Sequence, residues 1–200
     1  MSTRFFSFSD DTPFSTEAAL VNASSSHYEE DWPSIPHTHA FTELFYVSEG
    51  SGEFLIENQR FSIKKDDLII VNPHIQHTET SLSASPLSYY TVGVDGISFS
   101  FHDQKEFQIF HCRQKHADLL FYFHSLFQEL DEKNDGYEEI CKHTLAILIA
   151  QLRRFAVSDF QLFPSFHPSK ECALVKRYLD SHYSDDINLE QLASLSHLNK

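Results

Sequence analysis

Histidines and a glutamate gather in one short stretch of the sequence. His37, His39 and Glu43 all occupy odd-numbered positions. On a regular strand, side chains at alternate positions project from the same face, and this face would also carry Phe41 and Phe45. If it lines the inside of a folded sheet, imidazoles and a carboxylate meet there beside aromatic rings. We therefore interpret these residues as a candidate ligand-binding site.

A further histidine, His77, follows Pro73 and could join this site from a neighbouring strand. The imidazoles of His37, His39 and His77 with the carboxylate of Glu43 would suit Fe(II), Mn, Ni, Cu or Zn, with positions left for water or substrate. In the alternative interpretation, the same groups hydrogen-bond to one another and to a polar effector without a metal. A divalent transition metal is thus a candidate cofactor, and none is obligatory.

The spacing of these residues resembles the first motif of the cupin superfamily, His-x-His-x3-Glu-x6-Gly. His37, His39, Glu43 and Gly50 match it, and the resemblance covers residues 30–100. The second cupin motif fits less well, because no glycine stands between Pro73 and His77, and Asp66-Asp67 replaces the usual glycine before that strand. The form Asn-Pro-x-x-x-His at 72–77 instead resembles the sensor domains of AraC-type regulators.

Short β-rich runs separated by turn residues dominate the sequence up to residue 111. Close spacing without intervening helices favours an antiparallel sandwich or barrel. With the cupin resemblance, the expected fold is mainly β with C-terminal α: a cupin-like antiparallel β-barrel (double-stranded β-helix) followed by an antiparallel helix pair. Residues 4–14 are expected to form an N-terminal arm on this barrel, which spans 1–111. The strands are expected at 42–48, 53–57, 60–63, 68–71, 87–94 and 97–101.

Helical periodicity replaces the β pattern after residue 112. Apolar residues recur at separations of three and four over 116–130 and 137–155, with a break at Asn134-Asp135-Gly136. Helices joined by so short a break should pack antiparallel. The apolar stripe of 137–155 is wide, which suggests a subunit interface in a helical dimerisation region at 112–157; packing on the chain's own barrel is the equal alternative.

A linker is expected at 158–169, because Pro164 and Pro168 disfavour a helix there. Beyond it, Tyr178-Leu179-x-x-His182-Tyr183 and Ile187-Asn188-Leu189-Glu190-x-Leu192-Ala193 resemble the opening of an AraC-type DNA-binding domain. Asn188 is a plausible N-cap for the helix that follows. The resemblance implies that residues 170–200 are the truncated start of a helix-turn-helix domain; an ordinary helical hairpin is the alternative.

The composition argues against several classes of protein. There are 29 acidic and 15 basic residues, a formal net charge of -14, so the chain alone should bind DNA poorly. No apolar run is long enough to span a membrane and no signal peptide is apparent, so we expect a cytoplasmic protein with no membrane partner. Cys112, Cys141 and Cys172 are too widely spaced for a zinc knuckle and are interpreted as buried free thiols.

Together, the two resemblances imply the ligand-sensing and dimerisation portion of an AraC-type transcription regulator. A small polar effector, such as a sugar or similar metabolite, would bind in the barrel, and a homodimer would contact DNA only through the full-length C-terminal domain. No catalytic residue is expected in this interpretation. One rival is a metal-dependent cupin enzyme with His37, His39, Glu43 and His77 as ligands. The other is a constitutive dimerisation module with an empty barrel.

Overall fold

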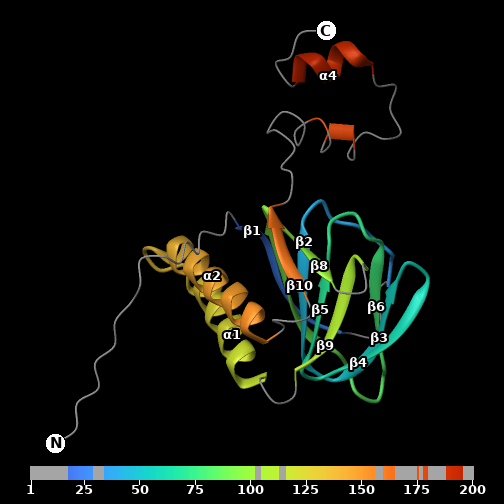
Figure 1. Ribbon diagram of the computed structural model, residues 1–200, viewed down its shortest axis with the longest axis vertical. Coiled ribbons are helices and arrows are strands. Elements are labelled where there is room, and N and C mark those ends of the chain that lie inside the picture. The colour runs from blue at the N-terminus through green and yellow to red at the C-terminus, as the bar shows by residue number, and fades with distance from the viewer. Residues whose placement is uncertain are drawn as a thin grey trace, which may run out of the picture. The chain divides into compact units, whose positions relative to one another are not determined.

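The computed structural model describes residues 18–28, 34–101, 105–112, 116–155, 160–164, 175, 178–179 and 188–195. The chain divides into two compact units, Met1–Ser165 and Phe166–Lys200, which are described separately. The first unit contains antiparallel sheets and a pair of helices (Figure 1). The expected arm at 4–14 lies outside the described residues. None of the helices among the residues described is long and apolar enough to cross a membrane.

The strands of the first unit form three sheets in which every pairing is antiparallel. The largest sheet has the order β1 (Ala19–His27), β7 (Ser88–Asp95), β2 (Thr42–Glu49), β5 (Asp67–Val71) and β9 (Phe107–His111). The second has the order β4 (Gln59–Lys64), β3 (Ser51–Ile56) and β6 (His77–Ser81). The third pairs β10 (Phe160–Pro164) with β8 (Ile97–Phe101). This is the expected cupin-like, mainly β architecture.

The large sheet is covered on both faces. Between it and the three-stranded sheet lies one apolar core, to which β2 contributes Phe45 and Val47. Its other face packs against helices α1 (His116–Glu132) and α2 (Tyr137–Phe155), with Leu44 and Tyr46 of β2 in that second core. Successive side chains of a strand point to opposite faces, and the apolar run of β2 from Leu44 to Val47 therefore serves both cores.

Tight turns connect the strands where the sequence indicated them. Gly50 has a φ of +79° between β2 and β3, and Glu57 and Asn58 have φ values of +46° and +69° between β3 and β4. Two successive residues with positive φ are typical of a type I′ hairpin turn, which matches the twist of the strands that it joins. At Gly50 a Cβ atom would lie 1.9 Å from the Pro86 carbonyl oxygen, so the turn requires a glycine there.

The helix pair agrees with its sequence pattern. Helix α2 has the expected bounds, and α1 extends two residues beyond the expected end at 130. The break between them contains Gly136, with a φ of +84°. The predicted stripe of α2 is divided: one part is buried, and Ile140 and Ile147 are 45% and 44% exposed. The cysteine on α2, Cys141, is buried and free, as is Cys112; Cys172 lies outside the described residues.

Four strands were not expected from the sequence: β1, β6, β9 and β10. β1 contains a run of serines and β6 reads His-Thr-Glu-Thr-Ser, so neither has the apolar alternation of a typical strand. Strand β10 lies within the segment interpreted as a linker and pairs with β8. It ends at Pro164, which suits an edge position because proline cannot donate to a ladder.

In the second unit, the structure describes helix α4 (Leu189–Leu195). Its N-terminus is capped as predicted: the Gln191 amide donates to Asn188 Oδ1 at 2.9 Å, and the Asn188 amide donates to Gln191 Oε1 at 3.0 Å. This reciprocal pair satisfies two backbone donors that a helix start leaves free. The DNA-binding resemblance also used residues in 170–187 and 196–200. Of these, the structure describes only residues 175, 178 and 179.

Candidate ligand-binding site

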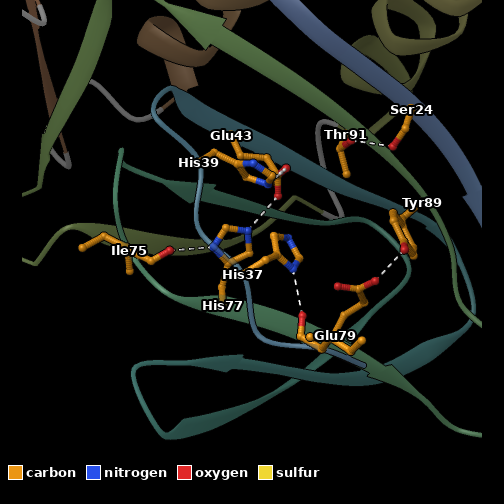
Figure 2. A network of polar contacts seen from close by, with 10 residues as sticks. Ser24, His37, His39, Glu43, Ile75, His77, Glu79, Tyr89 and Thr91 are labelled. Atoms are coloured by element: carbon orange, nitrogen blue, oxygen red, sulfur yellow. Dashed lines mark hydrogen bonds and ion pairs between the residues drawn. The ribbon is translucent and has the colours of Figure 1, made fainter. Parts of the chain in front are cut away.

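His37 and His77 lie side by side although they are far apart in the sequence. Each backbone amide donates to the other's carbonyl oxygen at 3.0 Å, which forms an isolated antiparallel bridge. A third backbone bond, from the His74 amide to the His39 carbonyl at 2.7 Å, holds the same two segments together. The loop before β2 is therefore fixed against the start of β6, and this brings the predicted histidines to one place (Figure 2).

This arrangement differs from the expected one. A regular strand was expected to carry positions 37 to 45 on one face, but β2 begins only at Thr42. Glu43 and Phe45 do alternate on the inner face of β2, whereas His37, His39 and Phe41 precede it. Backbone hydrogen bonds between the loop before β2 and the segment around His74 and His77, and not strand parity, therefore place His39 and His77 next to Glu43.

Glu43 lies between two of the imidazoles. Its Oε2 is 3.3 Å from His39 Nε2, and its Oε1 is 3.3 Å from His77 Nε2. The Glu43 and His77 side chains are 7% and 2% exposed, and that of His39 is 24% exposed. The His37 ring completes the cluster, with its centroid 4.9 Å from His39 and 4.7 Å from His77. The cluster thus extends from an exposed residue, His37, to a buried carboxylate.

Hydrogen bonds to the backbone orient two of the rings. His77 Nδ1 lies 2.9 Å from the Ile75 carbonyl oxygen, and His37 Nδ1 lies 3.0 Å from that of Ile35. A carbonyl oxygen only accepts, so each Nδ1 carries the proton in these contacts. The Nε2 atom of each ring is then the one left to face Glu43 or a bound molecule.

The charges of the cluster reinforce one another. Burial alone would raise the pKa of Glu43, but the close contacts with His39 and His77 and the charges of these imidazoles outweigh it and lower that pKa to about 2. Burial alone would lower the pKa of His77, but its close contact and charge interaction with Glu43 raise it above the ordinary 6.5. The pair is therefore a carboxylate with a cationic imidazole over the weakly acidic range.

The same residues fit a metal ion. The ligand nitrogens of His37, His39 and His77 all lie within 4.8 Å of one another. Of the side-chain atoms described, the buried Nε2 of His77 lies 3.3 Å from Glu43 Oε1 as an ion pair but lacks a hydrogen bond of good geometry, and such an atom is what a metal would satisfy. Imidazole and carboxylate ligands suit first-row divalent metals. His37, His39 and His77, with Glu43 beside them, would hold such an ion, and it would supply open positions for oxygen atoms of a ligand.

The predicted aromatic residues have different positions. Phe41 stacks on the His39 ring at 4.7 Å between centroids, with 9° between the planes. It also lies over Gly93, where a Cβ atom would be 2.6 Å from the Phe41 ring. Phe45 is 1% exposed and belongs to the apolar core, where it packs on Phe54 and Tyr89. Phe41 therefore borders the histidine cluster, and Phe45 lies in the core between the sheets.

Sequence reasoning missed two residues beside the cluster, Glu79 and Tyr89. The Tyr89 hydroxyl donates to Glu79 Oε1 at 2.5 Å, and both residues are buried. Glu79 lies two positions after His77, and this spacing would have placed both side chains on one face of a strand. The segment was not predicted to be a strand, because its sequence is polar.

A family model of the AraC-like ligand-binding domain matches residues 24–148, more than half of the chain. The chain belongs to this family. The match confirms the resemblance to AraC-type sensor domains and includes His37, His39, Glu43 and His77. No curated protein matches the sequence.

The chain is similar to solved structures at low sequence identity. The apo form of a ToxT variant from Vibrio cholerae superposes with a TM-score of 0.52 at 10% identity, covering 88% of this chain and 70% of that one. ToxT from Vibrio cholerae bound to an unsaturated fatty acid has a TM-score of 0.49 at 11% identity, covering 92% and 70%. A cupin protein from Bacteroides fragilis has a TM-score of 0.34 at 18% identity, covering 46% and 82%. The first of these supports the fold of this AraC-like domain.

Proposed function

We propose that this chain is the ligand-sensing and dimerising portion of an AraC-type transcription regulator and has no catalytic role. The observation that supports this best is the convergence of His37, His39, Glu43 and His77 inside the segment matched by the AraC-like ligand-binding family. These groups, with the ring of Phe41 beside them, would bind a small polar effector such as a sugar, and Phe45, which the sequence also suggested, would support the site from the core. Polar groups fix hydroxyls, and ring faces cover the apolar edges of such a molecule.

Strand β2 contributes side chains both to this site and to the contact with the helices. Glu43 points toward the histidines, and Tyr46, three residues later, stacks on Phe123 of α1 with ring centroids 5.1 Å apart. A change in the position of β2 would therefore act on both the site and the helix packing. The effector would shift this equilibrium only by binding one arrangement more tightly than the other.

Dimerisation would use the exposed apolar side chains of the helix pair. Phe121 of α1 is 63% exposed, and Ile140 and Ile147 of α2 are nearly half exposed. Ile140 and Ile147 are seven residues apart and share one face of α2, and apolar side chains gathered on one exposed face favour an interaction site. In the homodimer, DNA would be contacted only through the C-terminal domain whose start we infer at 170–200, because the net charge of -14 disfavours contact through the rest of the chain.

Isothermal titration calorimetry against a broad metabolite panel that includes sugars tests effector binding. The proposal predicts saturable heat with at least one compound, and His39→Ala and Glu43→Ala should each weaken that binding about tenfold or more. His143→Ala is the matched control, because that histidine is 67% exposed on α2, away from the site. No binding by any compound, or equal binding by all three variants, would contradict the proposal.

A second candidate, a metal-dependent cupin enzyme, is favoured by the buried Nε2 of His77, which lacks a hydrogen bond of good geometry. It predicts stoichiometric divalent metal in the purified protein by elemental analysis, and turnover of a substrate that is lost on chelation. Metal-free protein that retains full stability and binds an effector would eliminate this candidate.

A further inference from the structure

Glu79 and Tyr89 form a buried polar pair next to the histidine cluster. Tyr89 is 4% exposed and Glu79 is 7% exposed. The tyrosine hydroxyl donates to Glu79 Oε1 at 2.5 Å, and Glu79 is two residues beyond His77 on β6, so both side chains leave the same face of that strand. Figure 2 shows this pair beside the rings of His37 and His77.

Hydroxyl groups line the adjacent part of β1 and β7. Ser24 Oγ lies 2.6 Å from Thr91 Oγ1, and Ser26 interacts with Tyr89. The register aligns these residues across the large sheet, with Ser24 opposite Thr91 and Ser26 opposite Tyr89. The serines made β1 a poor strand candidate, and two of them, Ser24 and Ser26, place hydroxyl groups beside Thr91 and Tyr89.

Two carboxylates, which accept hydrogen bonds, lie in this region. Glu43 interacts electrostatically with Tyr89, and Glu79 interacts with His77, so the two carboxylates share one region. Glu43 is matched by His39 and His77. Glu79 forms no salt bridge within the described ranges, and no hydrogen bond from a described residue reaches its Oε2 atom. A buried carboxylate with a single neutral donor is costly and favours a further donor from a ligand.

We propose that Glu79, positioned by Tyr89, is a second effector-binding carboxylate and that the effector is a polyhydroxylated molecule without negative charge. This inference rests on the proposed function and narrows its ligand class. Hydroxyl or ammonium groups of the effector donate charge-assisted hydrogen bonds to Glu43 and Glu79, and His77 Nε2, which lacks a hydrogen bond of good geometry, completes its contacts together with the hydroxyls of β1 and β7. A carboxylate on the effector meets the like charge of Glu79, which forms no salt bridge within the described ranges, and is disfavoured.

The test uses matched hexoses that differ in one group. Calorimetry on the full chain, with chelator present, compares glucose, galactose and mannose with their 2-amino and uronic acid forms. We expect a neutral or amino form to bind at least about tenfold more tightly than the uronic acid of the same series. Glu79→Gln keeps the acceptor for Tyr89 and removes the charge, and it should reduce this preference about tenfold. Glu53→Gln is the control, because Glu53 is an exposed carboxylate on β3.

Tyr89→Phe provides a second test that does not depend on how well Glu79→Gln folds. It should weaken binding of the neutral hexose while the preference over the uronic acid remains. Equal binding of uronic acids, an unchanged preference in Glu79→Gln, or no binding by any hexose would overturn this inference. The broader metabolite panel with His39→Ala and Glu43→Ala tests the proposed function separately, so its failure is distinguishable.

Discussion

His77 Nε2 lies 3.3 Å from Glu43 Oε1, and the two side chains are only 2% and 7% exposed. The residues are contributed by different sheets, Glu43 by β2 and His77 by β6. Their contact therefore joins the large sheet to the three-stranded sheet at the candidate site. An ion pair in this position couples the stability of the fold to the occupancy of the site.

The stability of the metal-free protein should decrease as the pH rises above 6.5. The pKa of His77 is raised in the folded state, so its contribution is fully present below the ordinary value of 6.5 and is lost as the pH rises through the folded value. Glu43 has a pKa lowered to about 2 from 4.5, so its contribution is present above 4.5 and is lost as the pH falls toward 2. Urea unfolding between about pH 5 and pH 9, with chelator present, measures the His77 contribution. An identical pH profile in His77→Gln would contradict the assignment.

The two bridged histidines should contribute very differently to stability. His77→Ala leaves the buried Glu43 carboxylate with one imidazole partner, and we expect a loss of about 3 kcal/mol in the free energy of unfolding. His37→Ala removes an exposed ring and keeps the backbone bridge, so the loss should be below about 0.5 kcal/mol. Chemical denaturation of both variants gives the comparison, and equal losses would show that the Glu43 contact is not the stabilising one.

Asn72 should be essential for stability although it contacts no candidate ligand group. Its Nδ2 donates to the Phe99 carbonyl at 2.6 Å and to Glu106 Oε2 at 2.8 Å, and its Oδ1 accepts from the Phe99 amide at 2.9 Å. Asn72→Ala removes three hydrogen bonds of a buried side chain, two of them to the backbone of β8, so the free energy of unfolding should fall by about 2 to 3 kcal/mol. Thermal and urea unfolding test this, with the exposed Asn134→Ala as control.

Two glycines with similar φ should respond differently to alanine. In Gly50→Ala the new Cβ would lie 1.9 Å from the Pro86 carbonyl oxygen, and strain and overlap together should cost about 3 kcal/mol or more. At Gly136 no atom lies within 4 Å of such a Cβ, so only the positive φ is penalised, by about 1 to 2 kcal/mol. Unfolding experiments on both variants compare them directly. A smaller loss at Gly50 than at Gly136 would refute the close approach to Pro86.

The helix surface should control oligomeric state. A charge at Ile147, as in Ile147→Glu, should weaken the proposed dimer at least tenfold, or about 1.4 kcal/mol, because it places a carboxylate in an apolar contact. Sedimentation velocity over a range of concentrations measures the shift. Leu82→Glu is the matched control, since Leu82 is 53% exposed and lies outside the helix pair. A dimer that survives Ile147→Glu, or a chain that never dimerises, would contradict this interface.

Much of the fold follows from local patterns. Helix α2, the break at Gly136 and the N-cap at Asn188 could be predicted because helix periodicity, positive φ and capping depend on residues close in sequence. The strands from β2 to β5 were predicted for the same reason, since apolar runs and turn residues alternate there.

The polar strands could not be predicted in this way. β1 and β6 are strands because each pairs with an apolar neighbour, β7 and β3, and strand pairing is a contact between distant segments. Strand β10 likewise depends on pairing with β8, which lies about sixty residues earlier in the sequence. Local composition carries no information about such partners.

The candidate site shows the same division. The sequence by itself determined which groups were available, since His37, His39 and Glu43 carry a recognisable spacing and His77 follows a proline turn. Only the tertiary structure decided that the segments bridged by His37 and His77 place His39 and His77 against Glu43, and that Glu79 and Tyr89 lie beside this cluster. The physical reason is that backbone hydrogen bonds and burial between separate strands set these distances, and neither is encoded in the spacing of residues along one segment.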